Sequence, residues 1–274
     1  MTALAGPAAG TNSLPRLVRI ELVKLTSVRL SYGLLAVSVG LTLLWTILQA
    51  SQAGKANGPE PLTGYAGQTS IITGGVWGLI FAAVLGVTIS SGEFRHHTAT
   101  LTYLATPGRN RVLVAKAVAG AIGGAAFGLA VYAVTLAVGL SFVAGHDYRL
   151  VIGAGTLTGW GFGHLVGAGL LGVIGVVVGS LVRSQFATVI GVFVWTIIIE
   201  SLIGGLFSSA RPYLPYTAAT ALAGTPLGSA SFGPGRGASG VVPLPFAAGT
   251  ALLAAIAIAG ALIAARTTIR RDVT

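Results

Sequence analysis

The sequence predicts an all-α polytopic membrane protein that crosses the bilayer six times. Charged residues make up 8% of the 274-residue chain and hydrophobic residues 54%, whereas a soluble domain carries about 25% charged residues. The apolar residues gather in uncharged stretches, several of which reach the roughly 20 helical residues that cross the hydrocarbon core. The absence of cysteine excludes disulfides, thiolate metal sites and a cysteine nucleophile.

Six spans within a single domain, residues 1–274, account for these stretches. We expect them near residues 31–50, 69–91, 117–144, 151–182, 187–208 and 243–265. The third and fourth exceed the minimum length, so they are expected to tilt or to project beyond the bilayer. Residues 33–48 also fit the apolar region of a signal peptide, but the long patterned segment before them favours an uncleaved first span.

The basic residues predict the orientation. With the N-terminus inside, the outside set is limited to Lys55, Arg149, Arg211 and Arg236, and the rest of the 16 Lys and Arg residues lie on the cytoplasmic side. This positive-inside bias places both termini in the cytoplasm. A net charge of +10 can indicate nucleic-acid binding, but here the charges flank apolar runs, so no nucleic-acid partner is expected. The Arg-, Ala- and Gly-rich composition suggests a bacterial protein, hence the bacterial plasma membrane.

The first expected element is an amphipathic helix over residues 13–30. Ser13 can cap it, Pro15 fits its first turn, and Leu17 belongs to its apolar side. Glu21 departs from the pattern because it falls on the apolar side. Such a helix before a span lies at the membrane surface, unless the segment is only a frayed basic lead that enforces topology. The basic residues expected to anchor this helix at the interface are Arg16, Arg19 and Lys24.

A second helix is expected between the second and third spans, over residues 92–105. Pro107-Gly108 stops it. Phe94, His97, Leu101 and Leu104 recur at helical spacing, so they form an apolar ridge that fits a partner's groove or lies unpartnered at the interface. Adjacent His96 and His97 point in different directions and have no third histidine close in sequence, so no metal site is expected.

Glycines recur every four residues in the third and fourth spans. The positions are Gly120, Gly124, Gly128, Gly155, Gly159, Gly163 and Gly167. Small residues at this spacing let two helices approach closely, although a chain with 41 glycines also produces the spacing by chance.

Three residues within the spans are candidates for the translocation path. Glu200 is the acid that lies well inside a span, and an ionisable group there is costly and by default a functional candidate. Trp195 accompanies it in the fifth span, and His164 lies in the fourth. The alternatives are a protonated Glu200 hydrogen-bonded between helices and a neutral His164 that donates to a carbonyl. The Pro- and Gly-rich outside loop over 209–242 follows, with one short helix expected over 217–223.

The order of several motifs resembles the ABC-2 type family of ABC transporter permeases. Glu93 precedes Thr98-Ala-Thr-Leu101, which is followed by Leu104-Ala-Thr-Pro-Gly-Arg109 and by Lys116 at the start of the next span. The family usually has glycine where this chain has Ala99. Glu21-Leu-Val-Lys24 with Arg29 resembles the leading interfacial helix of the family, and Trp195 with Glu200, then Leu214-Pro215, resembles actinobacterial members.

The resemblance implies a transport subunit rather than an enzyme. It implies a path between two six-span subunits, a homo- or heterodimer, and two cytoplasmic ATPase subunits that carry ATP and Mg. The coupling helix would span residues 92–105, with Glu93, Phe94, Arg95, His97, Thr98, Leu101 and Leu104 at the ATPase. Arg109, Arg111 and Lys116 would anchor the third span at the headgroups. The three lysines, Lys24, Lys55 and Lys116, each lack the Ser or Thr that follows a phosphate-binding P-loop lysine, so ATP hydrolysis is expected on another chain.

Three other functional classes remain open from the sequence. A secondary transporter or channel would work without an ATPase and would favour several paired charges within the spans. A membrane anchor of another complex would need neither a path nor a coupling helix. An intramembrane enzyme would need a nucleophile or metal centre, and the chain has no HExxH motif.

Overall fold

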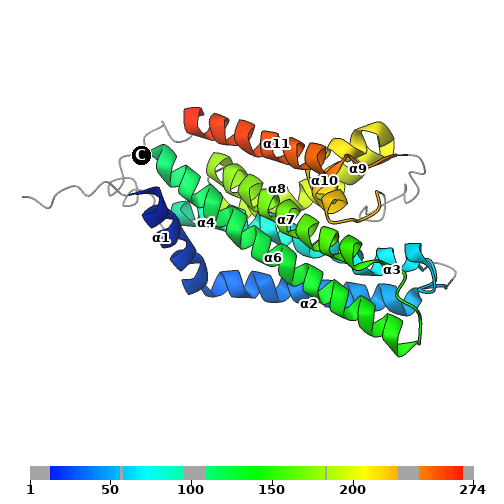
Figure 1. Ribbon diagram of the computed structural model, residues 1–274. Coiled ribbons are helices and arrows are strands. Elements are labelled where there is room, and N and C mark those ends of the chain that lie inside the picture. Colours follow the sequence, from blue (N-terminus) through cyan, green and yellow to red (C-terminus); the bar gives the residue numbers. More distant parts are fainter. Residues whose placement is uncertain (1–12, 56–57, 96–108, 183, 228–240, 268–274) are drawn as a thin grey trace, which may run out of the picture.

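The computed structural model describes residues 13–55, 58–95, 109–182, 184–227 and 241–267, and this part of the chain is helical without strands (Figure 1). Side chains are described over the same ranges except at residues 93–95 and 109. Six helical stretches are long and apolar enough to cross a membrane, which confirms the all-α class and the six spans.

Four of the six spans are single helices. They are α2 (Arg29–Gln52), α6 (Arg109–Gly145), α7 (Ala154–Val182) and α11 (Phe246–Thr267). The helix α6 begins before residue 117, where the third span was expected, because Arg109 to Lys116 continue the helix ahead of the apolar run. It is therefore longer than the hydrocarbon core requires.

The second and fifth spans are interrupted. The second consists of α3 (Tyr65–Ile72), the 3-10 turn η1 (Gly74–Val76) and α4 (Trp77–Arg95). The fifth consists of α8 (Gln185–Phe193), the π-helical segment η2 (Val194–Ile199) and α9 (Glu200–Leu206). Neither interruption was predicted from the sequence.

Shorter elements lie at the two ends of the bundle. At one end α1 (Leu14–Ser27) precedes α2, from which the extended residue Val28 separates it. At the other end the chain turns after α9 through η3 (Ser208–Tyr213) into α10 (Pro215–Leu222), close to the short helix that was expected. Figure 1 shows α1 near the start of α6 and the C-terminal end of α11, and α3, α9 and α10 toward the opposite end. These are called the α1 end and the α10 end below.

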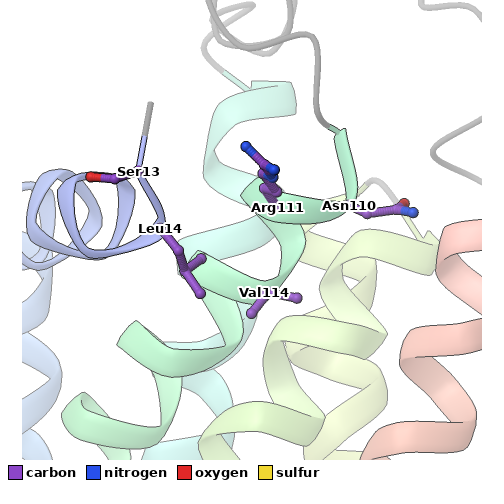
Figure 2. Close-up of a pocket in the computed structure, with 5 residues that line it drawn as sticks. All are labelled: Ser13, Leu14, Asn110, Arg111 and Val114. Carbon is purple, nitrogen blue, oxygen red and sulfur yellow. The ribbon is translucent and has the colours of Figure 1, made fainter. Parts of the chain in front are cut away.

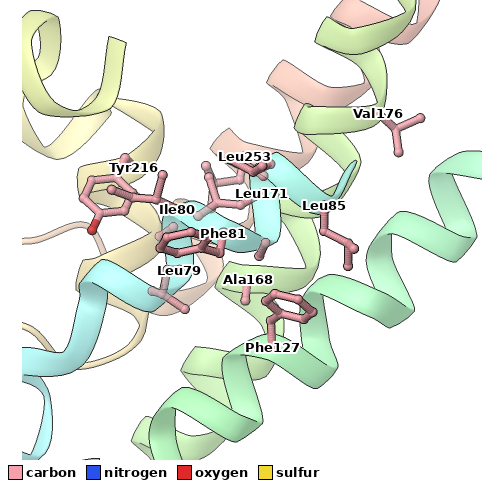
Figure 3. Close-up of a cluster of buried hydrophobic side chains, with 14 of the residues drawn as sticks. Leu79, Ile80, Phe81, Leu85, Phe127, Ala168, Leu171, Val176, Tyr216 and Leu253 are labelled. Carbon is pink, nitrogen blue, oxygen red and sulfur yellow. The ribbon is translucent and has the colours of Figure 1, made fainter. Parts of the chain in front are cut away.

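The core forms around α4, which is the most enclosed part of the bundle. Leu79, Ile80 and Leu85 of α4 are almost completely buried, and they pack with residues of α6, α7, α10 and α11 (Figure 3). The residues labelled from those neighbours are Phe127, Ala168, Leu171, Val176, Tyr216 and Leu253. A buried span of this kind needs no polar outer face, which agrees with the apolar sequence of α4 from Trp77 to Val87.

The helices α6 and α7 cross at the predicted glycines of the third span. A Cβ atom at Gly120 would lie 2.7 Å from Val176 Cγ2, and Cβ atoms at Gly124 and Gly128 would meet the backbone carbonyls of Ala168 and His164. In α7, Gly163 and Gly167 lie against the backbone of α10, whereas Gly155 and Gly159 have nothing within 4 Å of a Cβ. The glycines thus permit two separate close contacts, α6 with α7 and α7 with α10.

Candidate functional sites at the two ends of the bundle

The α1 end contains an ion cluster that joins three helices. The Glu21 carboxylate of α1 accepts from Lys24 Nζ at 2.9 Å and from Lys116 Nζ of α6 at 3.2 Å. Lys116 Nζ also donates to the Ile89 carbonyl of α4 at 3.1 Å. Glu21 is 5% exposed and Lys116 is 4% exposed, so their attraction acts away from water. Residue Lys116 therefore ties α1 to both helices that flank residues 96–108.

This arrangement gives the predicted interfacial anchors different environments. Arg16 and Arg19 of α1 are exposed, as is Arg111 at the start of α6. The Lys24 side chain is 44% exposed. Lys116, expected among the headgroups, is instead buried beneath α1, because Glu21 on the apolar side of that helix provides its counter-charge. The side chain of Arg109 lies outside the described residues.

The predicted coupling helix is described only at its beginning. The backbone of Glu93, Phe94 and Arg95 continues α4, and their side chains lie outside the described residues. The other predicted residues of this helix lie wholly outside the described residues; they are His97, Thr98, Leu101 and Leu104. The structure does show the two helices to which this segment connects, α4 and α6, both held by Lys116.

An open cleft lies between the first turns of α1 and α6 (Figure 2). Its lining combines the apolar side chains of Leu14 and Val114 with the polar ones of Ser13, Asn110 and Arg111. No acidic residue is among the described residues of the lining. The cleft is therefore polar at the helix starts and apolar below them.

The α10 end contains the second candidate site, centred on Glu200. The side chain is 3% exposed. Its Oε1 atom accepts from Trp195 Nε1 at 3.0 Å and from the Tyr216 N–H at 2.9 Å. Its Oε2 atom accepts from the N–H and the hydroxyl of Thr217 at 3.0 and 3.1 Å. Glu200 thereby receives two of the free N–H groups at the start of α10, which a capping side chain would otherwise satisfy.

The π-helical segment η2 explains how Trp195 reaches Glu200. Residues five apart in an α-helix point about 140° away from one another, since each residue turns the helix by about 100°. In a π-helix the hydrogen bonds run from residue i to i+5, so such residues lie nearly above one another. The segment Val194–Ile199 brings the indole N–H over the carboxylate.

Glu200 thus holds α10 onto the fifth span, a role that the sequence did not predict for it. Its place in a translocation path stays a prediction, as does that of Trp195, which is 43% exposed. Arg211 follows in η3, is 2% exposed, and lies close to Gly204, where a Cβ would be 2.9 Å from its Nε. The chain reversal after α9 brings Arg211 back over the helix that it follows.

Tyr216 connects this site to the interrupted second span. Its hydroxyl donates to the Val76 carbonyl in η1 at 2.8 Å, while its backbone N–H donates to Glu200. Burial, with the nearby Glu200 carboxylate as a second cause, raises the pKa of the Tyr216 phenol, so the hydroxyl keeps its proton and remains a donor. The sequence analysis missed Tyr216. The available signal was Pro215, which can start a helix shortly after the span that contains Glu200. The N–H groups at such a helix start need an acceptor.

His164 lies between the two sites in α7. It is fully buried, its Nδ1 atom is 2.9 Å from the Trp160 carbonyl, and its ring packs on Tyr132 at 4.9 Å between centroids. Its Nε2 atom has no hydrogen-bond partner among the described residues. The contact with Trp160 is the carbonyl interaction that was one of the two alternatives for this residue. No group of three His, Cys, Asp or Glu side chains in the described part of the chain could hold a metal.

Comparison with known proteins does not assign this chain to a family. No family model matches the sequence, and no curated protein matches it. Its class is defined by the six long apolar helices, which are those of a multi-pass helical membrane protein.

Proposed function

We propose that the chain is the transmembrane permease subunit of an ATP-driven ABC-2 type exporter, working as a dimer with two separate ATPase chains. The observation that carries this proposal is the buried contact of Lys116 with Glu21 and Ile89. It joins α1, α4 and α6 at the end of the bundle to which the predicted coupling helix, residues 92–105, connects. An anchor subunit would need no such joint.

The joint suits a subunit that receives force from outside. A partner that moves residues 92–105 pulls on α4 and α6 together, because the segment begins within α4 and the chain continues from it into α6. The ion pair then makes α1 follow them. Buried ion pairs resist separation strongly, since parting them leaves an uncompensated charge away from water. ATP and Mg would bind on the partner chain, and this chain would supply the path and the docking segment.

The proposal also accounts for the segregation of polar groups. Three of the described charges inside the bundle serve helix-to-helix joints: Glu21 with Lys116 at one end, and Glu200 at the start of α10 at the other. The fourth, Arg211, is buried in η3 at the α10 end. A secondary transporter driven by ions would favour coupled charges in mid-bundle. His164, buried there, contacts a carbonyl and an aromatic ring.

The test is purification of the tagged chain from its native host in mild detergent, with mass spectrometry of co-purifying proteins. We expect a stoichiometric ATPase with the parent chain. Phe94→Asp and Leu101→Asp should each abolish its recovery, because a charge on the apolar ridge opposes docking in a groove. Phe94→Leu and Leu101→Met, which keep the ridge apolar, should retain it.

Val242→Asp is the matched control at the opposite end. Val242 is 78% exposed beside α11, so the same charge there should leave ATPase recovery unchanged. Recovery of the ATPase with both ridge variants would contradict the docking role of residues 92–105. Absence of any ATPase from a chain that elutes as a single symmetric peak would contradict the permease assignment and favour a secondary transporter, a channel or an anchor.

A further inference from the structure

The hydrogen-bonding pattern of the second span changes at η1, between α3 and α4. In η1, Gly75 has φ −75° and ψ 17°, which departs from the α-helix. A turn of this kind breaks the regular ladder of bonds between each carbonyl and the N–H four residues on. A carbonyl oxygen has two lone pairs, so the carbonyls at such a turn can also accept a hydrogen bond from a side chain.

Hydroxyl groups from two other parts of the chain provide donors along this interruption. From α2, Ser38 Oγ donates to the Gly78 carbonyl at 3.2 Å, and Thr42 Oγ1 lies 3.5 Å from the Gly75 carbonyl. From the α10 side, Tyr216 donates to Val76 at 2.8 Å, and Thr225 Oγ1 donates to the Thr73 carbonyl at 2.9 Å. All four donor residues are buried.

The two sets of donors differ in how they are held. Ser38 and Thr42 belong to a spanning helix of 24 residues, so their positions are fixed by the whole span. Tyr216 and Thr225 belong to α10 and the turn after it, an element of 8 residues that does not cross the bundle. Its start is held by the Glu200 carboxylate, through Tyr216 and Thr217. The hydrogen bonds from Tyr216 and Thr225 are thus shorter than those from α2, although they come from a much shorter helix and the turn after it.

The glycines at the interruption allow this close packing. A Cβ at Gly78 would lie 2.8 Å from Thr42 Oγ1 and 2.9 Å from Ser38 Oγ, so larger residues would push the α2 donors away. At Gly75 a Cβ would lie 2.8 Å from Thr42 Cγ2. Gly74, by contrast, has nothing within 4 Å of a Cβ, so it is not required for packing there. Its remaining property is backbone freedom, which a hinge uses.

We propose that η1 is a hinge at which α3 moves relative to α4, and that Tyr216 and Thr225 form a latch through which α10 holds the hinge in the conformation described. Releasing the latch removes the hydroxyl hydrogen bonds to the Val76 and Thr73 carbonyls and lets the α10 end of the second span open, while Ser38 and Thr42 remain as the pivot. The proposal concerns the chain by itself and does not depend on an ATPase partner.

The cysteine-free sequence allows a direct test by thiol labelling. Ile72→Cys places a thiol at the end of α3, at a residue that is 0% exposed. When opening is fast and reversible, the rate at which a maleimide reacts with this thiol in nanodisc-reconstituted protein is proportional to the open population. Val176→Cys, also at a 0% exposed position but in the core between α6 and α7, reports opening elsewhere.

We expect Tyr216→Phe and Thr225→Val each to raise the labelling rate at position 72 by about 2- to 10-fold, since each removes one hydrogen bond at nearly constant shape. The double variant should raise it by roughly the product. The rate at position 176 should stay unchanged. Thr188→Val is the matched control, because it removes another buried threonine hydroxyl, which is bonded to the Ser184 carbonyl at the start of α8.

Two results would overturn the latch. The first is an unchanged rate at position 72 in both variants, which would show that the hydroxyls do not restrain α3. The second is an equal rise at positions 72 and 176, or an equal rise with Thr188→Val, which would show general destabilisation rather than a local opening. Both results are independent of whether an ATPase co-purifies, so they leave the proposed function untouched.

Discussion

Replacing Glu21 by Gln is predicted to destabilise the chain more than replacing its partner Lys116 by Met. The Lys116 side chain is 5% exposed, and its ammonium group is 3.2 Å from the carboxylate. Glu21→Gln leaves this ammonium buried without its counter-charge, and breaking a buried pair from one side costs about 3–5 kcal/mol. The amide oxygen of Gln still accepts a hydrogen bond, so the lower part of that range applies.

Lys116→Met leaves a smaller deficit. Glu21 keeps Lys24 at 2.9 Å, and that side chain is 44% exposed, so the carboxylate retains a partner connected to water. The main losses are the pair itself and the hydrogen bond to the Ile89 carbonyl, about 1–3 kcal/mol together. The double variant Glu21→Gln with Lys116→Met removes both buried charges and should lie within about 2 kcal/mol of the parent, because neither charge is left uncompensated.

Thermal unfolding in nanodiscs, followed by the fluorescence of the four tryptophans, measures these differences. At about 2–4 °C per kcal/mol for a chain of this size, the midpoint should fall by about 6–12 °C for Glu21→Gln and by less for Lys116→Met. Lys24→Met is the control, since a pair with an exposed member contributes about 1 kcal/mol or less. A double variant whose loss equals the sum of the two single losses would refute the claim that these residues act as a pair.

Two further predictions concern the glycines and Glu200. Gly124→Leu should abolish folding of the membrane-inserted chain, because the new side chain meets the Ala168 carbonyl. The loss of folding would be seen as loss of the monodisperse peak in size-exclusion chromatography. Gly155→Leu should leave this peak unchanged, because a Cβ at Gly155 has nothing within 4 Å. Glu200→Ala should lower the free energy of unfolding by about 2–5 kcal/mol, because it leaves buried N–H groups of α10 unpaired. Glu60→Ala removes an exposed carboxylate and should leave the free energy of unfolding unchanged. Equal unfolding midpoints for the two variants would contradict the anchoring role of Glu200.

The spans could be predicted because hydrophobicity is a local property of the sequence. A run of apolar residues long enough to cross the hydrocarbon core identifies a span without any knowledge of its neighbours. The interruptions could not be predicted in this way. Gly74 and Gly75 marked a point where the second span could bend, but the donors that make the bend tolerable, such as Tyr216 and Thr225, come from 140 and 152 residues farther along the chain.

The charged sites show the same limit. Glu21 was recognised as an exception on the apolar side of its helix, yet its partner Lys116 is 95 residues away, and no sequence spacing connects them. Lys116 was expected among lipid headgroups from the resemblance to the ABC-2 permeases. Glu200 was recognised as costly within a span. Its bonds to the start of α10 depend on the chain reversal after α9, which only the folded chain shows.

The two ends of the bundle are connected by a single rigid element. The helix α4 has 19 residues, about 28 Å at 1.5 Å per residue. Near its C-terminal end the Ile89 carbonyl accepts from Lys116, and directly before its N-terminal end the Val76 carbonyl accepts from Tyr216. Gly86 fixes α4 against α7, since a Cβ there would lie 2.8 Å from the Val176 nitrogen. A displacement of residues 92–105 would therefore move α4 and α7 as one body. The strain would concentrate at η1, where the helical ladder of hydrogen bonds is already interrupted and the α10 latch is the nearest restraint.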